Sequence, residues 1–186
     1  VEWSKANDEE FIRGVNFPSN MLYMEALLAA SELLHEPRLK EKAEHVKKMI
    51  EKYSFNGEFY IDNMIRNEKG EFIKTDHTTE TCQYYAFYFH IATKENHENL
   101  FTKMRKEFGP KWDDKKVYPQ VYKSNVFIGD YLRLMILLEY GYVEEVLDET
   151  VDYFYNMAKM TGTLWEHDST FASLNHGLTS SILNII

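Results

Sequence analysis

The chain has 186 residues, a length that fits one domain or a large piece of one. Hydrophobic residues make up 44% and aromatic residues 15%, which is enough for a packed core and excludes a disordered composition. The net charge is −9, with Lys and Arg interleaved among Asp and Glu, so we expect no nucleic-acid partner. Cys82 is the single cysteine, which excludes an internal disulfide and a multi-cysteine metal site but does not decide between cytoplasm and periplasm.

The ends of the sequence indicate an excerpt from a longer protein. The chain begins at Val1 without Met, and it stops inside the apolar run 182–186 with neither a helix cap nor a breaker. No apolar run approaches the roughly 20 residues of a membrane span, and no signal peptide is visible. We therefore expect no membrane span, and we expect the rest of the same domain to be a partner of this segment.

The first third of the chain predicts two helices and a hairpin. Residues 1–16 are polar and irregular. Pro18-Ser19-Asn20 reads as a helix start, and residues 21–34 are apolar almost all round, which is typical of a buried helix. Residues 39–53 carry apolar side chains at spacings of three, four and seven, the pattern of a one-sided outer helix. Two short strands, 58–65 and 71–74, flank a turn and predict a small β-hairpin.

The rest of the chain predicts five more helices. Residues 79–93 and 125–140 are again nearly all apolar, whereas 95–108 and 143–160 are amphipathic. The expected apolar positions of the last of these are Val143, Val146, Leu147, Val151, Phe154 and Met157. The loop between the helices 95–108 and 125–140 carries Trp112, Tyr118 and Tyr122. Ala172 begins a seventh, apolar helix.

Buried and one-sided helices thus alternate along the chain. The buried helices begin near residues 20, 79, 125 and 172, a repeat of roughly fifty residues that is typical of helical hairpins. This predicts an all-α fold, a partial (α/α) toroid with alternating inner and outer helices and a small β-hairpin in one loop. An open α-solenoid is the alternative, although its repeats are shorter, near ~34 residues.

The stretch 161–176 carries the candidate chemistry. Glu166 follows Trp165 and a small-residue turn, and it stands at the entrance of a predicted buried helix. An indole offers a flat face on which a sugar ring stacks, and burial beside it tunes a carboxylate for proton transfer. Asn175 and His176 open the next helix and are candidates to bond sugar hydroxyls. A metal set of His167, Asp168 and His176 is an alternative that we do not favour, because neighbouring residues do not easily face one ion, and we expect no cofactor.

Two motifs in this stretch resemble the catalytic domain of bacterial α-L-rhamnosidases, the six-hairpin glycosidases. Thr163-Leu164-Trp165-Glu166 is similar to the Trp-Glu signature of that family, and Ser173-Leu174-Asn175-His176 to its Ser-x-Asn-His signature. Glu2-Trp3 is a weaker match to an acidic residue before Trp, and Thr81-Cys82-Gln83 resembles a Thr-x-Gln helix start. The resemblance covers nearly the whole chain, so residues 1–186 would be the C-terminal portion of such a domain.

The resemblance implies an inverting glycoside hydrolase that acts on α-L-rhamnosides or related glycosides. Glu166 would be its general base, Trp165 a wall of the sugar pocket and His176 a contact to a sugar hydroxyl; Asn175, Trp3 and Glu2 complete the implied substrate-binding set. The general acid of the family lies upstream of Val1, so we expect the isolated chain to be inactive. The loop after Glu166 is shorter than in many members of the family. A non-catalytic carbohydrate-binding or scaffold module of the same fold is the alternative.

Overall fold

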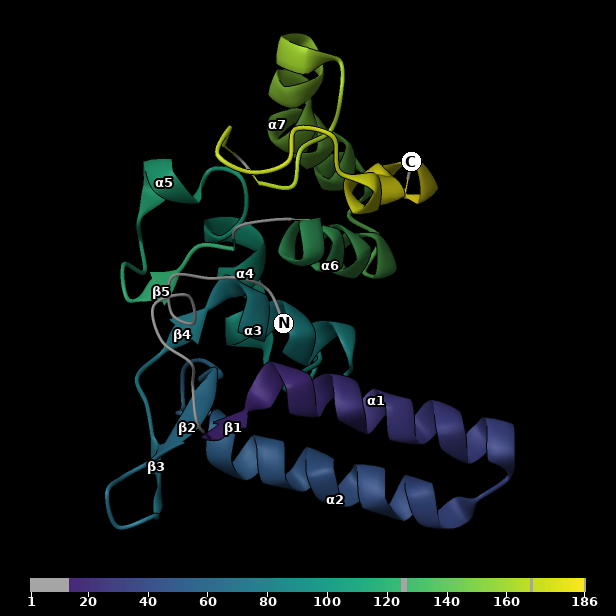
Figure 1. Ribbon diagram of the computed structural model, residues 1–186, viewed down its shortest axis with the longest axis vertical. Coiled ribbons are helices and arrows are strands. Elements are labelled where there is room, and N and C mark those ends of the chain that lie inside the picture. Colours follow the sequence, from purple (N-terminus) through teal and green to yellow (C-terminus); the bar gives the residue numbers. More distant parts are fainter. Residues whose placement is uncertain (1–13, 125–126, 168, 186) are drawn as a thin grey trace.

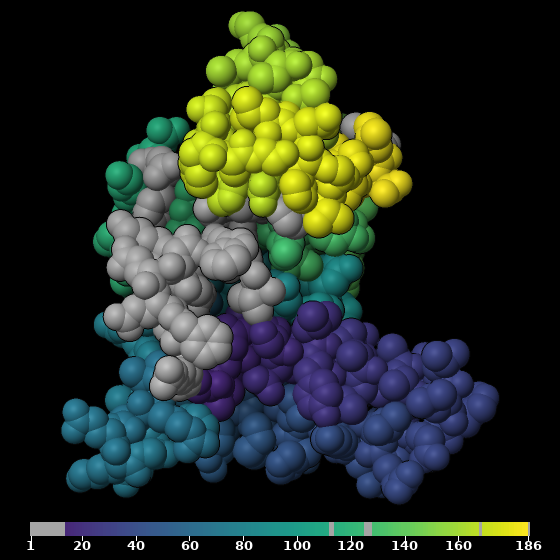
Figure 2. Space-filling model, in the orientation of Figure 1, coloured from purple at the N-terminus to yellow at the C-terminus, as the bar shows by residue number. Residues whose placement is uncertain are grey.

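A computed structural model gives the fold of the chain and describes residues 14–124, 127–167 and 169–185. Most of the described residues are helical. An antiparallel pair of helices, α1 and α2, lies at one end of the long axis, and helix α7 lies at the other end (Figure 1). The space-filling view shows the α1–α2 pair projecting sideways from the body of the molecule (Figure 2).

The described residues form α-helices, one 3-10 helix and short β-strands. The α-helices are α1 (Phe17–Leu34), α2 (Pro37–Ser54), α3 (Glu80–Tyr88), α4 (Glu98–Glu107), α5 (Trp112–Lys115), α6 (Phe127–Glu139) and α7 (Val143–Thr161). A 3-10 helix, η1 (Gly177–Asn184), follows α7. The strands are β1 (Gly14–Asn16), β2 (Asn63–Arg66), β3 (Phe72–Lys74), β4 (Thr78–Thr79) and β5 (Val121–Tyr122).

Helix α1 begins earlier than the sequence predicts and is less buried. The side chain of Asn16 caps it by accepting a hydrogen bond from the Ser19 N–H at 2.9 Å, and Pro18 fits the first turn because its missing N–H is not needed there. One face is buried, but Leu22, Leu33 and Leu34 on the rest of the helix are 50–80% exposed. The expectation of a helix buried on all sides is therefore wrong for this chain. Its outer partner α2 is one-sided, as predicted.

The predicted β-hairpin is confirmed, but its first strand is β2 at Asn63–Arg66 and not 58–65, and one further strand is added to it. Strands β2 and β3 pair antiparallel with Ile65 opposite Ile73, and the Asn67 side chain closes the turn by accepting from two backbone N–H groups. Strand β1 lies in a segment that the sequence marks as irregular, but it pairs antiparallel with β2. A second, parallel pair joins β4 to β5.

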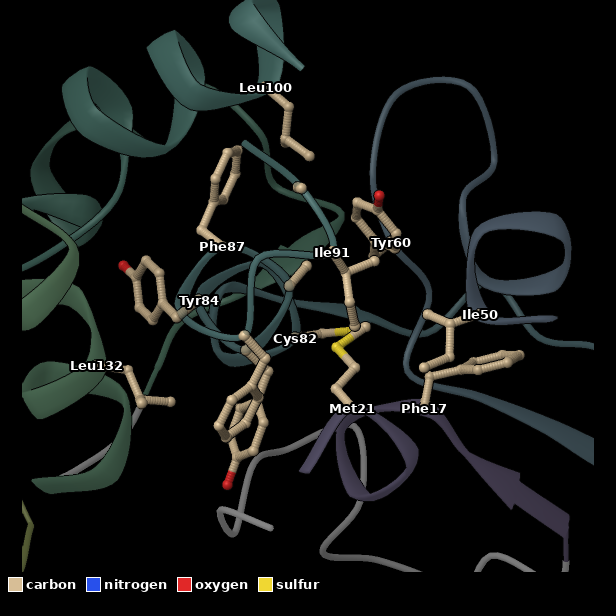
Figure 3. Packing of buried hydrophobic residues seen from close by; sticks show 14 of the residues in the cluster. Phe17, Met21, Ile50, Tyr60, Cys82, Tyr84, Phe87, Ile91, Leu100 and Leu132 are labelled. Atoms are coloured by element: carbon tan, nitrogen blue, oxygen red, sulfur yellow. The ribbon is translucent and has the colours of Figure 1, made fainter. Parts of the chain in front are cut away.

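The main core surrounds α3, the most buried helix of the described chain. Thr79 caps α3 by accepting from the Cys82 N–H at 3.0 Å, and the helix ends at Tyr88 rather than near Thr93. Figure 3 shows Met21 of α1 close to Cys82, while Leu132 of α6 lies on the opposite side of α3. Helix α4 covers this core with a one-sided apolar face, as predicted.

A second cluster lies between α6, α7 and η1. It contains buried side chains from all three elements and from the segment before η1: Leu134, Leu137, Val146, Phe154, Met157, Trp165 and Ile182. The predicted apolar face of α7 is right for Val146, Phe154 and Met157. It is wrong for Val143, Leu147 and Val151, which are 50–58% exposed because the buried stripe of α7 runs beside them.

The predicted seventh helix is also only partly right. No α-helix begins at Ala172 in the described residues. The chain continues as a loop to His176 and then forms the 3-10 helix η1. Backbone hydrogen bonds between the two limbs of this loop, described below, take the place of the expected helical ones.

Segments that precede the more buried helices gather on one side of the molecule. The chain enters α1, α3, α6 and η1 from the same side, where β1, β4, β5 and α5 also lie (Figure 1). Among the described helices, none is both long and apolar enough to cross a membrane.

Candidate functional site

The loop between α7 and η1 is a folded two-limbed structure. Helix α7 ends at Thr161 and is capped by Gly162, which adopts a left-handed conformation with φ of 72°. The Glu166 N–H then donates to the Ser173 carbonyl at 2.8 Å, and the His176 N–H donates to the Leu164 carbonyl at 2.9 Å. These bonds pair the limb before Glu166 with the limb before His176, so two sequence motifs that lie ten residues apart become neighbours.

Trp165 anchors this loop in the second core cluster. Its side chain is only 2% exposed, and its indole N–H donates to Thr161 Oγ1 at 2.8 Å. Its backbone carbonyl accepts from Thr179 Oγ1 at 2.7 Å, which ties the loop to η1. The ring packs among core residues, so it does not offer the open face that sugar stacking requires. In this chain Trp165 holds its neighbour Glu166 in place.

Glu166 itself is half-buried. Its Oε2 accepts a long hydrogen bond of 3.4 Å from the Ser173 N–H, and its own N–H is taken by the Ser173 carbonyl. Both the backbone N–H and the carboxylate of Glu166 are thus bonded to Ser173. Because a carboxylate has about four acceptor positions, one long bond leaves it able to accept from a water molecule or a hydroxyl group.

The other predicted residues are distributed around Glu166 in different ways. His176 is half-buried and lies beside Leu164, two residues before Glu166. Asn175 is exposed, and its N–H and carbonyl both bond Ser173 Oγ. His167 is 9% exposed, and its ring centroid is 4.6 Å from that of Phe171.

Three of the predicted residues lie outside the described part of the chain. These are Glu2 and Trp3, named as substrate contacts, and Asp168, named in the alternative metal set. In the described ranges, no group of three or more His, Cys, Asp or Glu side chains could hold a metal ion.

Glu166 is not among the residues that line five of the pockets on the described part of the chain. One apolar pocket of about 500 Å³ lies between α1, α2 and the three-stranded sheet, with Met49 and Phe72 in its wall. Another, of about 420 Å³, lies between α6 and η1, with Tyr131 and Leu178 in its wall.

Two deeply buried carboxylates were not predicted from the sequence. Asp62 precedes β2 and Glu80 begins α3, and each is 1% exposed. Burial raises the pKa of Asp62 to about 7, although the hydrogen bonds from Thr79 oppose the change. Burial likewise raises the pKa of Glu80 to about 7, against the N–H groups of Ser124 and Gly109 and the charge of Arg133. One feature of the sequence could have indicated the position of Glu80: the Thr before it marks a helix N-terminus, where a carboxylate is favoured.

Comparison with known proteins gives one informative likeness. No protein-family model and no curated protein matches the sequence. Among solved structures, the fold is similar to the GH78 family rhamnosidase of Bacillus sp. GL1, with a TM-score of 0.77 at 15% identity. The match covers 98% of this chain and 20% of that chain. The likeness expected from the two motifs is thus confirmed at the level of fold, and the chain has the fold of about one fifth of a GH78 rhamnosidase.

Proposed function

We propose that the chain is the C-terminal portion of a six-hairpin glycosidase catalytic domain, and that its helical hairpins form part of an (α/α) toroid. Its substrates would be α-L-rhamnosides or related glycosides. The observation that carries this proposal is the fold likeness over 98% of the chain to only 20% of a rhamnosidase. A segment that resembles part of a domain needs the remainder of that domain to work.

Glu166 is the general base in this proposal. It removes a proton from a water molecule as the water attacks the anomeric carbon, and the stereochemistry at that carbon inverts. Inverting enzymes leave ~6.5–9.5 Å between their two carboxyl groups to hold this water. The half-buried carboxylate, with one long bond from Ser173, retains the acceptor positions for it. The general acid comes from chain upstream of Val1.

The neighbours of Glu166 take supporting roles. Trp165 fixes the backbone beside the base, and precise placement of a catalytic group is a large part of catalysis. His176, on the paired limb, contacts a sugar hydroxyl. Asn175, Glu2 and Trp3 remain proposed substrate contacts on the strength of the family resemblance alone.

The test is Glu166→Gln in the full-length parent protein. We expect turnover of an aryl α-L-rhamnoside to fall by about 10²–10⁴-fold, because the amide does not accept the proton. Added azide, an anion that needs no base, should restore cleavage and give a glycosyl azide of inverted configuration. The control is Glu144→Gln, which removes an exposed carboxylate from the first turn of α7 and should leave turnover unchanged. Near-normal hydrolysis by Glu166→Gln would remove this residue from the mechanism.

A non-catalytic carbohydrate-binding or scaffold module of the same fold is the second candidate. The observation that favours it is that Glu166 is not among the residues that line those five pockets on the described part of the chain. Calorimetry with oligosaccharides and activity assays of the parent protein separate the two. Binding without turnover by the parent supports the module, whereas turnover by the parent and none by the 186-residue chain supports the hydrolase.

A further inference from the structure

A single buried carboxylate ties together the two ends of the segment 110–123. Glu80 Oε1 accepts from the Gly109 N–H at 3.0 Å, and Oε2 accepts from the Ser124 N–H at 2.9 Å. Gly109 directly precedes the segment and Ser124 directly follows it. The side chain of Glu80 therefore closes the segment into a loop, and each carboxylate oxygen serves one end. We refer to these two hydrogen bonds as the Glu80 clamp.

Several neighbours of Glu80 favour its charged form, although burial opposes them and raises the pKa. Glu80 is the first residue of α3, where the free N–H groups of the helix favour a carboxylate. The positive charge of Arg133 also acts on the Glu80 carboxylate. Gly109 has φ of 98°, and a Cβ there would lie 2.6 Å from Arg133 Nε, so only glycine brings its N–H to Glu80 without displacing Arg133. Thr81 Oγ1 adds a bond of 3.3 Å to Ser124 Oγ.

The clamped segment is anchored along its length, for example by the ion pair of Lys111 with Asp152, and it carries exposed side chains between its anchors. Strand β5 pairs with β4, with Val121 opposite Thr78, and Val121 is fully buried. The Tyr118 ring meets Phe59 edge to face at 5.3 Å. By contrast, Val117 is 50% exposed and Tyr122 37% exposed. The conformation of these exposed side chains therefore depends on the anchors, and the clamp is the anchor that fixes both ends.

The segment also lies where it can border the proposed site. It leads into α6, and the loop that carries Glu166 leads into η1, which contacts α6. The chain enters both helices from the same side of the molecule (Figure 1). Ligand-contacting side chains are commonly carried on loops that a rigid scaffold positions.

We propose that Glu80 is a positioning residue whose carboxylate holds segment 110–123 as a rim of the glycoside site, with Tyr118 and Tyr122 on that rim. The proposal rests on the proposed function. According to this proposal, the Glu80 clamp affects the affinity for the glycoside but not the rate of proton transfer at Glu166.

The first test measures amide hydrogen exchange of the full chain with Glu80→Gln. The amide offers one acceptor oxygen and turns an N–H₂ donor toward the other backbone N–H, so one bond of the clamp is lost while the shape is kept. A hydrogen bond to a charged group contributes about 1.5–3 kcal/mol, which corresponds to exchange faster by a factor of about 10 to 150 in segment 110–123. The control is Asp62→Asn, an equally buried carboxylate that bonds Thr79 instead, and it should leave exchange in this segment unchanged.

The second test measures steady-state kinetics of the same variants in the full-length parent. Glu80→Gln should raise KM for an aryl glycoside about tenfold with kcat within about twofold, whereas Glu166→Gln should lower kcat. A purely structural defect would instead lower the active fraction, and hence kcat, without changing KM.

Each result decides part of the proposal. Unchanged exchange in Glu80→Gln overturns the clamp, and faster exchange with an unchanged KM overturns the rim. A wild-type parent without glycosidase activity overturns the proposed function and the rim with it, while the exchange experiment still decides the clamp. If Glu80→Gln does not fold, Glu80→Asp replaces it, because a side chain one methylene shorter cannot reach both N–H groups, and unchanged exchange in segment 110–123 of that variant then overturns the clamp.

Discussion

The indole N–H of Trp165 donates a hydrogen bond to the hydroxyl of Thr161 across 2.8 Å. Thr161 is the last residue of α7, and Trp165 directly precedes Glu166. The bond therefore spans the turn at Gly162 and ties the candidate catalytic loop to the end of the helix before it. An aromatic residue expected to face a sugar is instead part of the scaffold that holds the carboxylate.

Replacing Trp165 tests this scaffold role. Trp165→Phe should lower the free energy of unfolding by about 1–3 kcal/mol, because it loses the hydrogen bond and part of the packing against Met157 and Ile182. Thr161→Val should cost a similar amount by leaving the indole N–H without its acceptor. The double variant should cost less than the sum of the two, since both changes remove the same bond. Urea denaturation measures all three, and strict additivity would contradict the coupling.

Replacing Gly109 by Ala should destabilise the protein more than replacing Gly57, although the two glycines have the same backbone conformation. Gly57 has φ of 102° and Gly109 has φ of 98°, so Ala is strained at both. A Cβ at Gly57 meets nothing within 4 Å, whereas one at Gly109 lies 2.6 Å from Arg133 Nε. Gly57→Ala should therefore cost about 1–2 kcal/mol and Gly109→Ala clearly more. Equal midpoints in thermal denaturation would show that Arg133 moves aside freely.

Asp62 should make stability fall as the pH rises. Its pKa is about 7 in the folded protein against 3.8 for an exposed group, so the folded state binds more protons between these values. The stability contribution is complete below about pH 4 and is lost as the pH rises to about 7, by a few kcal/mol at most. Glu80 titrates in the same direction, so the measurement is the difference between variants.

Asp62→Asn isolates this effect because the amide oxygen still accepts from Thr79 Oγ1, which bonds Asp62 at 2.6 Å. The variant should lose stability more slowly than the wild type between pH 4 and pH 8, as followed by urea denaturation at several pH values. Parallel pH profiles for the two proteins would show that the buried carboxylate does not titrate in this range.

Arg133 and Glu149 form an ion pair whose two halves should depend on each other. Arg133 is fully buried, its Nε and Nη2 each lie 2.7 Å from Glu149, and its Nη1 donates to the Met104 carbonyl at 2.6 Å. Glu149→Gln leaves the buried cation without its counter-ion and should cost about 3–5 kcal/mol. The double variant Arg133→Met with Glu149→Gln should be more stable than Glu149→Gln alone. A double variant that is less stable would show that the carbonyl contacts of Arg133 outweigh its charge.

The alternation of hydrophobicity along the chain predicts most of the helices. The predicted helices 39–53 and 95–108 correspond to α2 and α4, which are buried on one face in the structure because each carries a one-sided apolar stripe. The turn around Asn67 also predicts its hairpin, since an Asn side chain can bond nearby backbone N–H groups without help from elsewhere. These features depend on local chemistry, which the sequence shows directly.

The sequence by itself determined the helical hairpins, the β-hairpin and the family resemblance around Trp165 and Glu166. Only the tertiary structure decided that Trp165 is buried, that Leu22 is exposed, that Asp62 and Glu80 lie in the core, and that the chain after Ala172 pairs as a loop. Burial depends on which elements lie across from a residue, and hydrogen bonds such as Glu80 to Ser124 join positions 44 residues apart. No local pattern carries that information, because it arises only when distant segments pack together.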